Sequence, residues 1–95
     1  MSPELDAAFA NARRQVERAI AEELRARDGE PAHDRLVALR DAIDREHAEA
    51  ATHGTVNPDW IARTVRDVAA WTPDTELALL AALGGIHRAA RSSGQ

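Results

Sequence analysis

The sequence predicts an all-α protein: a small four-helix bundle in which a long N-terminal helical hairpin packs with a shorter C-terminal helical pair. The chain has 95 residues, enough for a single small domain. Apolar residues recur every three or four positions, as on a helix, and no segment alternates as a strand would. Gly and Pro divide the chain into four such segments with short connections, so consecutive helices should run antiparallel.

The first half of the chain predicts two long helices, at about residues 3–28 and 31–53. Ser2 can cap the first helix, and Gly29 and Gly54 are stop signals for the two helices. Each helix carries one apolar stripe that should face the core. The stripes comprise Leu5, Phe9, Ala12, Val16, Ile20 and Leu24 on the first helix, and Leu36, Leu39, Ile43, His47 and Ala50 on the second.

The second half predicts two shorter helices, at about residues 58–71 and 73–91. Asn57-Pro58-Asp59 and Thr72-Pro73-Asp74 both place a capping residue before a first-turn Pro and an acid, which is a helix start signal. The tail, residues 92–95, is expected to fray.

The predicted core is thin. Leu, Ile, Val and Phe make up 18 of the 95 residues, a fraction at the edge of the composition of disordered chains. Much of the remaining apolar character comes from 21 Ala, which favour helix but bury little area each. We therefore expect a partner chain to complete the core, either a second copy in a homodimer or another protein.

The inventory of reactive side chains makes an enzyme the weaker hypothesis. The chain has 12 Arg but no Lys, Cys or Tyr, and its Ser residues lie only at positions 2, 92 and 93. These absences exclude a thiol nucleophile and a Schiff-base lysine, and they disfavour a serine triad. We expect no cofactor.

The charge of the chain argues against nucleic acid and anionic membranes as partners. The formal net charge is -4, and no helix presents a basic face. The longest uncharged run, residues 77–86, is far shorter than the roughly 20 residues that span a bilayer. We expect a cytoplasmic protein with solvated charged faces. These faces contain six i,i+4 pairs, Arg13–Glu17, Arg18–Glu22, Glu23–Arg27, Asp41–Arg45, Arg45–Glu49 and Arg63–Asp67.

The predicted fourth helix carries the least ordinary surface, because it is apolar around most of its circumference. Ala78, Ala82, Gly85 and Ala89 form a line of small residues, bordered by Leu79 and Ile86. A line of small residues lets another helix approach closely, which would make this face an interface between chains. The alternative is an ordinary buried bundle helix with a kink at Gly84-Gly85. Under the interface hypothesis, Leu79→Arg or Ala82→Arg would break association and leave the helix content intact.

Two tryptophans suggest a second interface. Trp60 and Trp71 are eleven residues apart and therefore lie within about 20° of each other on one helix. Ile61, Val65 and Val68 form a separate stripe on that helix. Either one Trp lies at an edge and belongs to a partner-binding patch, or both rings fill the core.

His47 and His87 are the candidates for a ligand site, because each lies on an apolar stripe about 15 residues into its helix. If those helices run parallel in the bundle, both rings could share a layer and, with Glu46, hold a metal ion or a small ligand. The chain has no matched pair of Glu-x-x-His segments, as a di-iron bundle requires. A structural role for both His is the alternative.

The sequence thus favours a non-enzymatic protein–protein interaction module, a small acidic adaptor, regulator or antitoxin-like inhibitor. It would associate with itself through Trp60, Trp71, Leu79, Ala82, Gly85 and Ile86 of its C-terminal helices. The alternative function is a metal- or small-ligand-binding bundle that uses His47 and His87.

Overall fold

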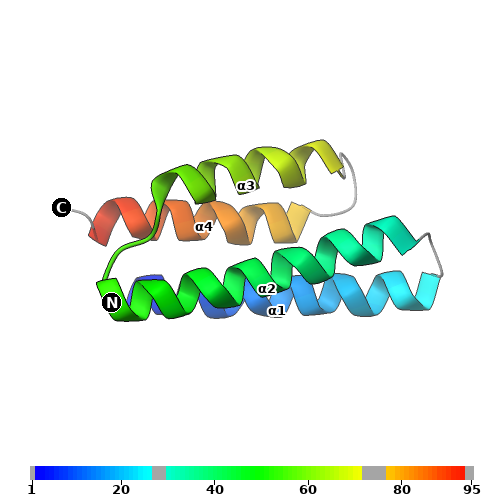
Figure 1. Ribbon diagram of the computed structural model, residues 1–95, viewed down its shortest axis with the longest axis horizontal. Helices are drawn as coiled ribbons and strands as arrows, with labels where there is room; N and C mark the ends of the chain where they lie inside the picture. The colour runs from blue at the N-terminus through cyan, green and yellow to red at the C-terminus, as the bar shows by residue number, and fades with distance from the viewer. Residues whose placement is uncertain (1, 27–29, 72–76, 94–95) are drawn as a thin grey trace.

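The computed structural model describes residues 2–26, 30–71 and 77–93, which form four helices and no strand (Figure 1). The all-α fold class is therefore confirmed. The helices are α1 (Pro3–Ala26), α2 (Glu30–His53), α3 (Pro58–Trp71) and α4 (Leu77–Ser93).

The observed helix bounds differ from the predicted ones mainly at the C-terminus. Helix α2 begins one residue early, at Glu30, and α4 continues to Ser93 where the sequence suggested fraying from residue 92. No Gly or Pro lies between Ile86 and Gly94, so nothing in the sequence stops the helix sooner. Residues 27–28, 73–76 and 94–95, which complete the predicted helices and tail, lie outside the described residues.

The predicted caps form local hydrogen bonds. The backbone N–H of Leu5 donates to Ser2 Oγ over 3.1 Å. Asn57 Oδ1 accepts from the N–H groups of Asp59 and Trp60 at the start of α3, over 2.9 and 3.3 Å. Gly54 ends α2 at φ 79°, and its N–H donates to the carbonyl of Ala50 over 2.7 Å. This is the left-handed helix stop that favours Gly.

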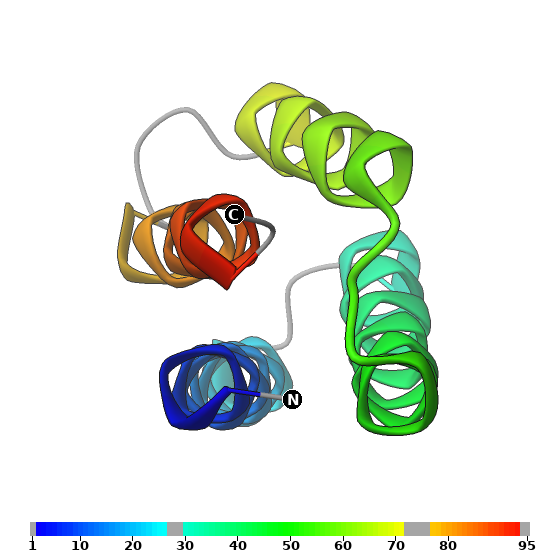
Figure 2. The ribbon, with the colours of Figure 1, turned by 90° about the vertical axis from the view of Figure 1, so that its left-hand side faces the viewer.

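The four helices run alternately up and down, and helix α1 lies between two partners (Figure 2). It packs against α2 and against α4, and α3 packs against α4. Among the described residues, α2 and α3 do not approach each other closely. We call the side of the bundle between α2 and α3, where the two backbones do not come close, the open side; the core residues Ile43 and Trp60 are nevertheless buried beneath it.

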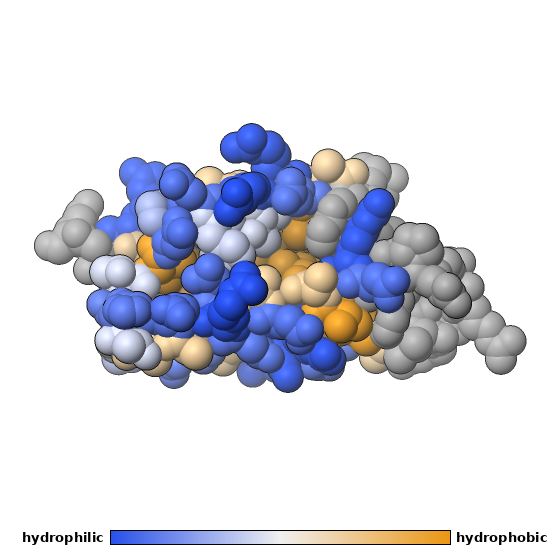
Figure 3. Space-filling model, viewed as in Figure 1, coloured by the Kyte–Doolittle hydropathy of each residue, from blue (hydrophilic) through white to orange (hydrophobic). Residues whose placement is uncertain are grey.

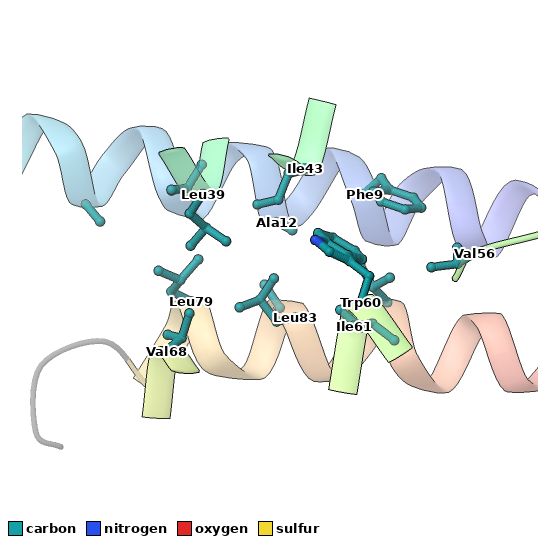
Figure 4. Packing of buried hydrophobic residues seen from close by; sticks show 14 of the residues in the cluster. Phe9, Ala12, Leu39, Ile43, Val56, Trp60, Ile61, Val68, Leu79 and Leu83 are labelled. Atoms are coloured by element: carbon teal, nitrogen blue, oxygen red, sulfur yellow. The ribbon is translucent and has the colours of Figure 1, made fainter. Parts of the chain in front are cut away.

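The core is one cluster that draws on all four helices. Phe9 and Leu5 of α1, Ile43 of α2 and Leu83 of α4 are completely buried. Trp60 reaches from α3 toward the centre of the bundle (Figure 4). Among the described residues, no polar or charged residue is buried. Apolar packing therefore holds the helices together.

Ion pairs across helices replace part of the expected i,i+4 pattern. Arg13 contacts Asp44 over 3.4 Å, and Arg40 contacts Glu17 over 3.5 Å, so both pairs join α1 to α2. These side chains are partly exposed, and such pairs contribute at most about 1 kcal/mol each.

Of the six expected pairs, Arg13–Glu17 and Arg18–Glu22 are confirmed, both at 3.3 Å. Two others are replaced: Asp41 contacts Arg40 over 3.4 Å, and Glu49 contacts His53 over 3.1 Å. Arg63 and Asp67 form no ion pair with each other, and Glu23–Arg27 lies outside the described side chains.

Candidate functional site

The residues predicted for an interface on α4 lie in the core of the chain itself. Leu79, Ala82 and Ile86 are 1%, 4% and 0% exposed. Helix α1, which packs closely against α4, is a main neighbour of this helix. An arginine at position 79 or 82 would therefore bring a charge into the core. The expectation that Leu79→Arg or Ala82→Arg leaves the helix content intact is therefore corrected. Either substitution would destabilise the fold, so neither can test association.

Gly85 is not required for a close approach of another backbone within the chain. A Cβ atom placed there would have only the Arg88 guanidinium nearby, with Nη2 at 3.9 Å. Whether Gly85 and its neighbours contact a second chain stays a prediction.

Trp60 is only 7% exposed and fills the core. Its ring points from α3 into the bundle and belongs to the buried cluster to which all four helices contribute (Figure 4). The side chain of Trp71 lies outside the described residues, so the predicted pairing of the two rings on one patch stays a prediction.

His47 has a partner on α1 and is about two-thirds buried. Its Nε2 lies 2.7 Å from Asp6 Oδ1, and its side chain is 32% exposed. The imidazole also stacks on Phe9, with ring centroids 4.8 Å apart and planes within 4° of each other. His47 therefore joins α1 to α2, which is a structural role.

The structure does not bring His47 and His87 into a metal site. Within the described ranges, no three His, Cys, Asp or Glu side chains gather closely enough to hold a metal ion. His87 lines a pocket at one end of the bundle, and neither Glu46 nor His47 is among the described residues that line it.

That pocket has a volume of about 260 Å³ and largely apolar walls. The beginning of α1, the α2–α3 connection, the beginning of α3 and the end of α4 meet around it. Local sequence patterns do not reveal this site, because its residues come from both ends and the middle of the chain. The i,i+4 spacing of His87 and Arg91 was the one signal available.

The open side between α2 and α3 carries some apolar surface, although the core residues Ile43 and Trp60 are buried beneath it. Figure 3 looks onto this side and shows hydrophobic residues along the middle of the face, framed by hydrophilic ones. A hollow of about 480 Å³ lies at the α2–α3 connection and is lined by both apolar and charged residues, including Glu46, Val56 and Pro58.

The flank of α3 on this open side carries two charges without partners. Asp67 lies seven residues after Trp60 and therefore on the same side of the helix, with Arg63 beside it. Both residues are exposed, and neither forms an ion pair or hydrogen bond within the described part of the chain.

Comparison with known proteins gave no match to a family model, a curated protein or a solved structure. Among the helices that the structure describes, none combines the length and the apolar character needed to cross a bilayer.

Proposed function

We propose that this protein is a non-enzymatic interaction module that associates with a second copy of itself through its C-terminal half. The observation that carries the proposal is the open side of the bundle, where α2 and α3 leave hydrophobic residues in view (Figure 3). An exposed apolar patch framed by polar residues is typical of a protein interface. The compartment that we propose is the cytoplasm, whose reducing conditions suit a chain without Cys.

The contact surface that fits this proposal is on α3. The apolar face of α4 is already covered by the chain, so it offers little area to a partner. In the part of the chain that the structure describes, the backbone of α3 lies close only to α4, and the other flank of α3 borders the open side. A second helix could lie along that flank and cover the hydrophobic residues beside it.

Charge complementarity favours a second copy as the partner. Arg63 and Asp67 are one turn apart and have opposite charges. In a twofold dimer with two antiparallel α3 helices, Arg63 of each copy faces Asp67 of the other. The arrangement forms two ion pairs from four charges that have no partner among the described residues of the single chain.

The first test is the mass in solution, by light scattering after size exclusion, at several concentrations. We expect the wild-type chain at twice 10.3 kDa. Arg63→Glu turns both cross-dimer pairs into repulsions and should weaken the dimer about 30-fold. The double variant Arg63→Asp/Asp67→Arg exchanges the charges and should restore the dimer.

Arg14→Glu is the control. It makes the same charge change at an exposed position on the outer side of α1, opposite the buried Leu5 and away from α3, so the dimer should persist. A wild-type chain that is monomeric at millimolar concentration would contradict self-association. A dimer that Arg63→Glu leaves unchanged would exclude this flank of α3 as the interface.

A further inference from the structure

The pocket at the end of the bundle has an apolar interior. Leu5 and Ile61 are completely buried there, and Val56 is nearly so. Figure 4 shows Val56 projecting into the space between α1 and α4. The pocket holds about 260 Å³, somewhat less than the roughly 300–1,000 Å³ that accept drug-sized ligands. Its size therefore limits a ligand to a short chain of atoms.

The polar groups of the pocket are all neutral or positive. His87 and Arg91 lie one turn apart on α4; His87 is half-buried and Arg91 is exposed. Within the described part of the chain, neither side chain has a hydrogen-bond or ion-pair partner. None of the nine described residues that line the pocket carries a carboxylate. No described residue therefore competes with an anion for the guanidinium at the mouth.

We propose that this pocket binds a short-chain aliphatic carboxylate. The alkyl chain would lie against Val56, Pro58 and Ala90, the apolar wall residues that keep accessible surface above the buried Leu5 and Ile61, where burial away from water favours it. The carboxylate would remain at the mouth, where Arg91 can donate two parallel hydrogen bonds. An N–H of the His87 ring can donate a third. The pairing of an apolar floor with a cationic rim matches the two ends of such a molecule.

The test is a titration of the ¹⁵N-labelled protein with hexanoate, followed by the amide shifts of the residues around the pocket. The largest shifts are expected at Thr55, Val56 and Ala90. From butanoate through pentanoate to hexanoate, each added methylene should tighten binding about fourfold. Hexanamide, which has the same length and no charge, should bind about tenfold more weakly than hexanoate.

A pair of variants on α4 locates the anion site. Arg91→Gln should weaken hexanoate about tenfold and remove the preference over hexanamide. Arg88→Gln, which removes the same charge from the same helix, should leave binding unchanged because Arg88 does not line the pocket. Both residues are exposed, so neither change should disturb the core.

Three results would overturn the proposal. The first is an absence of shifts at millimolar hexanoate, and the second is equal affinity for hexanoate and hexanamide. The third is tighter binding of N-acetyl-leucine than of hexanoate, which would assign the pocket to the C-terminus of a peptide. Repeating the titration on Arg63→Glu separates this site from dimerisation, because the pocket does not involve α3 beyond its first turn.

Discussion

His47 shows what the sequence and the structure each reveal about a single residue. Its place on an apolar stripe correctly indicates that it faces another helix. The stripe could not indicate that the facing residues are Asp6 and Phe9, because 41 positions separate His47 from Asp6. A helical period reports which side of a helix is covered, and the residue that covers it depends on how the helices stack. The sequence therefore allowed a ligand at the position beside His47 that Asp6 and Phe9 occupy in the structure.

The two contacts of His47 should contribute unequally to stability. The stack on Phe9 is buried on one side and is worth roughly 1 kcal/mol, whereas the contact with the exposed Asp6 carboxylate is worth less. We expect His47→Ala to lower the free energy of unfolding by about 1–2 kcal/mol. His47→Phe should keep most of that stability.

Urea unfolding of the two variants and of Asp6→Asn measures these contributions. Asp6→Asn is the matched control, because it weakens the polar contact and leaves the stack in place. If His47→Phe proved as unstable as His47→Ala, the hydrogen bond to Asp6 would be the dominant contact.

At the scale of the element, helix bounds were the part of the structure that the sequence predicted best. Ser2, Gly54 and Asn57 act as the predicted caps and stop, since their hydrogen bonds reach only two to four residues along the chain. The surface of α4 was harder to interpret. Its small and apolar residues suit an interface and a core equally, and only the position of α1 shows that Leu79 and Ile86 are buried here.

Glycines on two elements should respond to the same substitution with opposite sign. Gly54 adopts a positive φ of 79°, which Ala tolerates poorly, so Gly54→Ala should lower the free energy of unfolding by roughly 1 kcal/mol. Gly84 lies inside α4, where a Cβ would meet only the Arg88 side chain at 3.6 Å. Gly84→Ala should therefore raise the free energy of unfolding by up to about 1 kcal/mol.

Thermal unfolding followed by circular dichroism measures both glycine variants under the same conditions. A destabilised Gly84→Ala variant would mean that α4 needs a bend, or a neighbour, at that position.

At the scale of the whole molecule, α1 and α4 form the centre of the bundle. Among the described residues, the backbones of α1 and α4 each lie close to two other helices, whereas α2 lies close only to α1 and α3 only to α4. Short connections predicted antiparallel neighbours correctly, but they could not show that α2 and α3 would stand apart. The open side depends on the separation of α2 from α3, and the end pocket forms where the beginning of α1 meets the end of α4. Local sequence patterns cannot predict either feature, because both depend on how distant helices pack.

This hierarchy predicts how the bundle opens. Amide protons in the middle of α1 and α4 should exchange most slowly with solvent, because breaking their hydrogen bonds requires unfolding of the whole molecule. Those of α2 and α3 should exchange through smaller openings. Hydrogen exchange of the Arg63→Glu variant, measured by NMR at low concentration, avoids protection by a dimer. Equal protection in all four helices would show instead that the bundle opens as one unit.

The pairing of α1 with α4 also has a consequence for the newly made chain. Ribosomes deliver α1 first, and its main partner is the last helix that the structure describes. Until α4 emerges, the α1 surface that includes Leu5 and Phe9 can be only partly covered by α2. The nascent chain therefore exposes apolar surface of α1 through most of its synthesis. A chaperone that binds apolar segments would act on it during that interval.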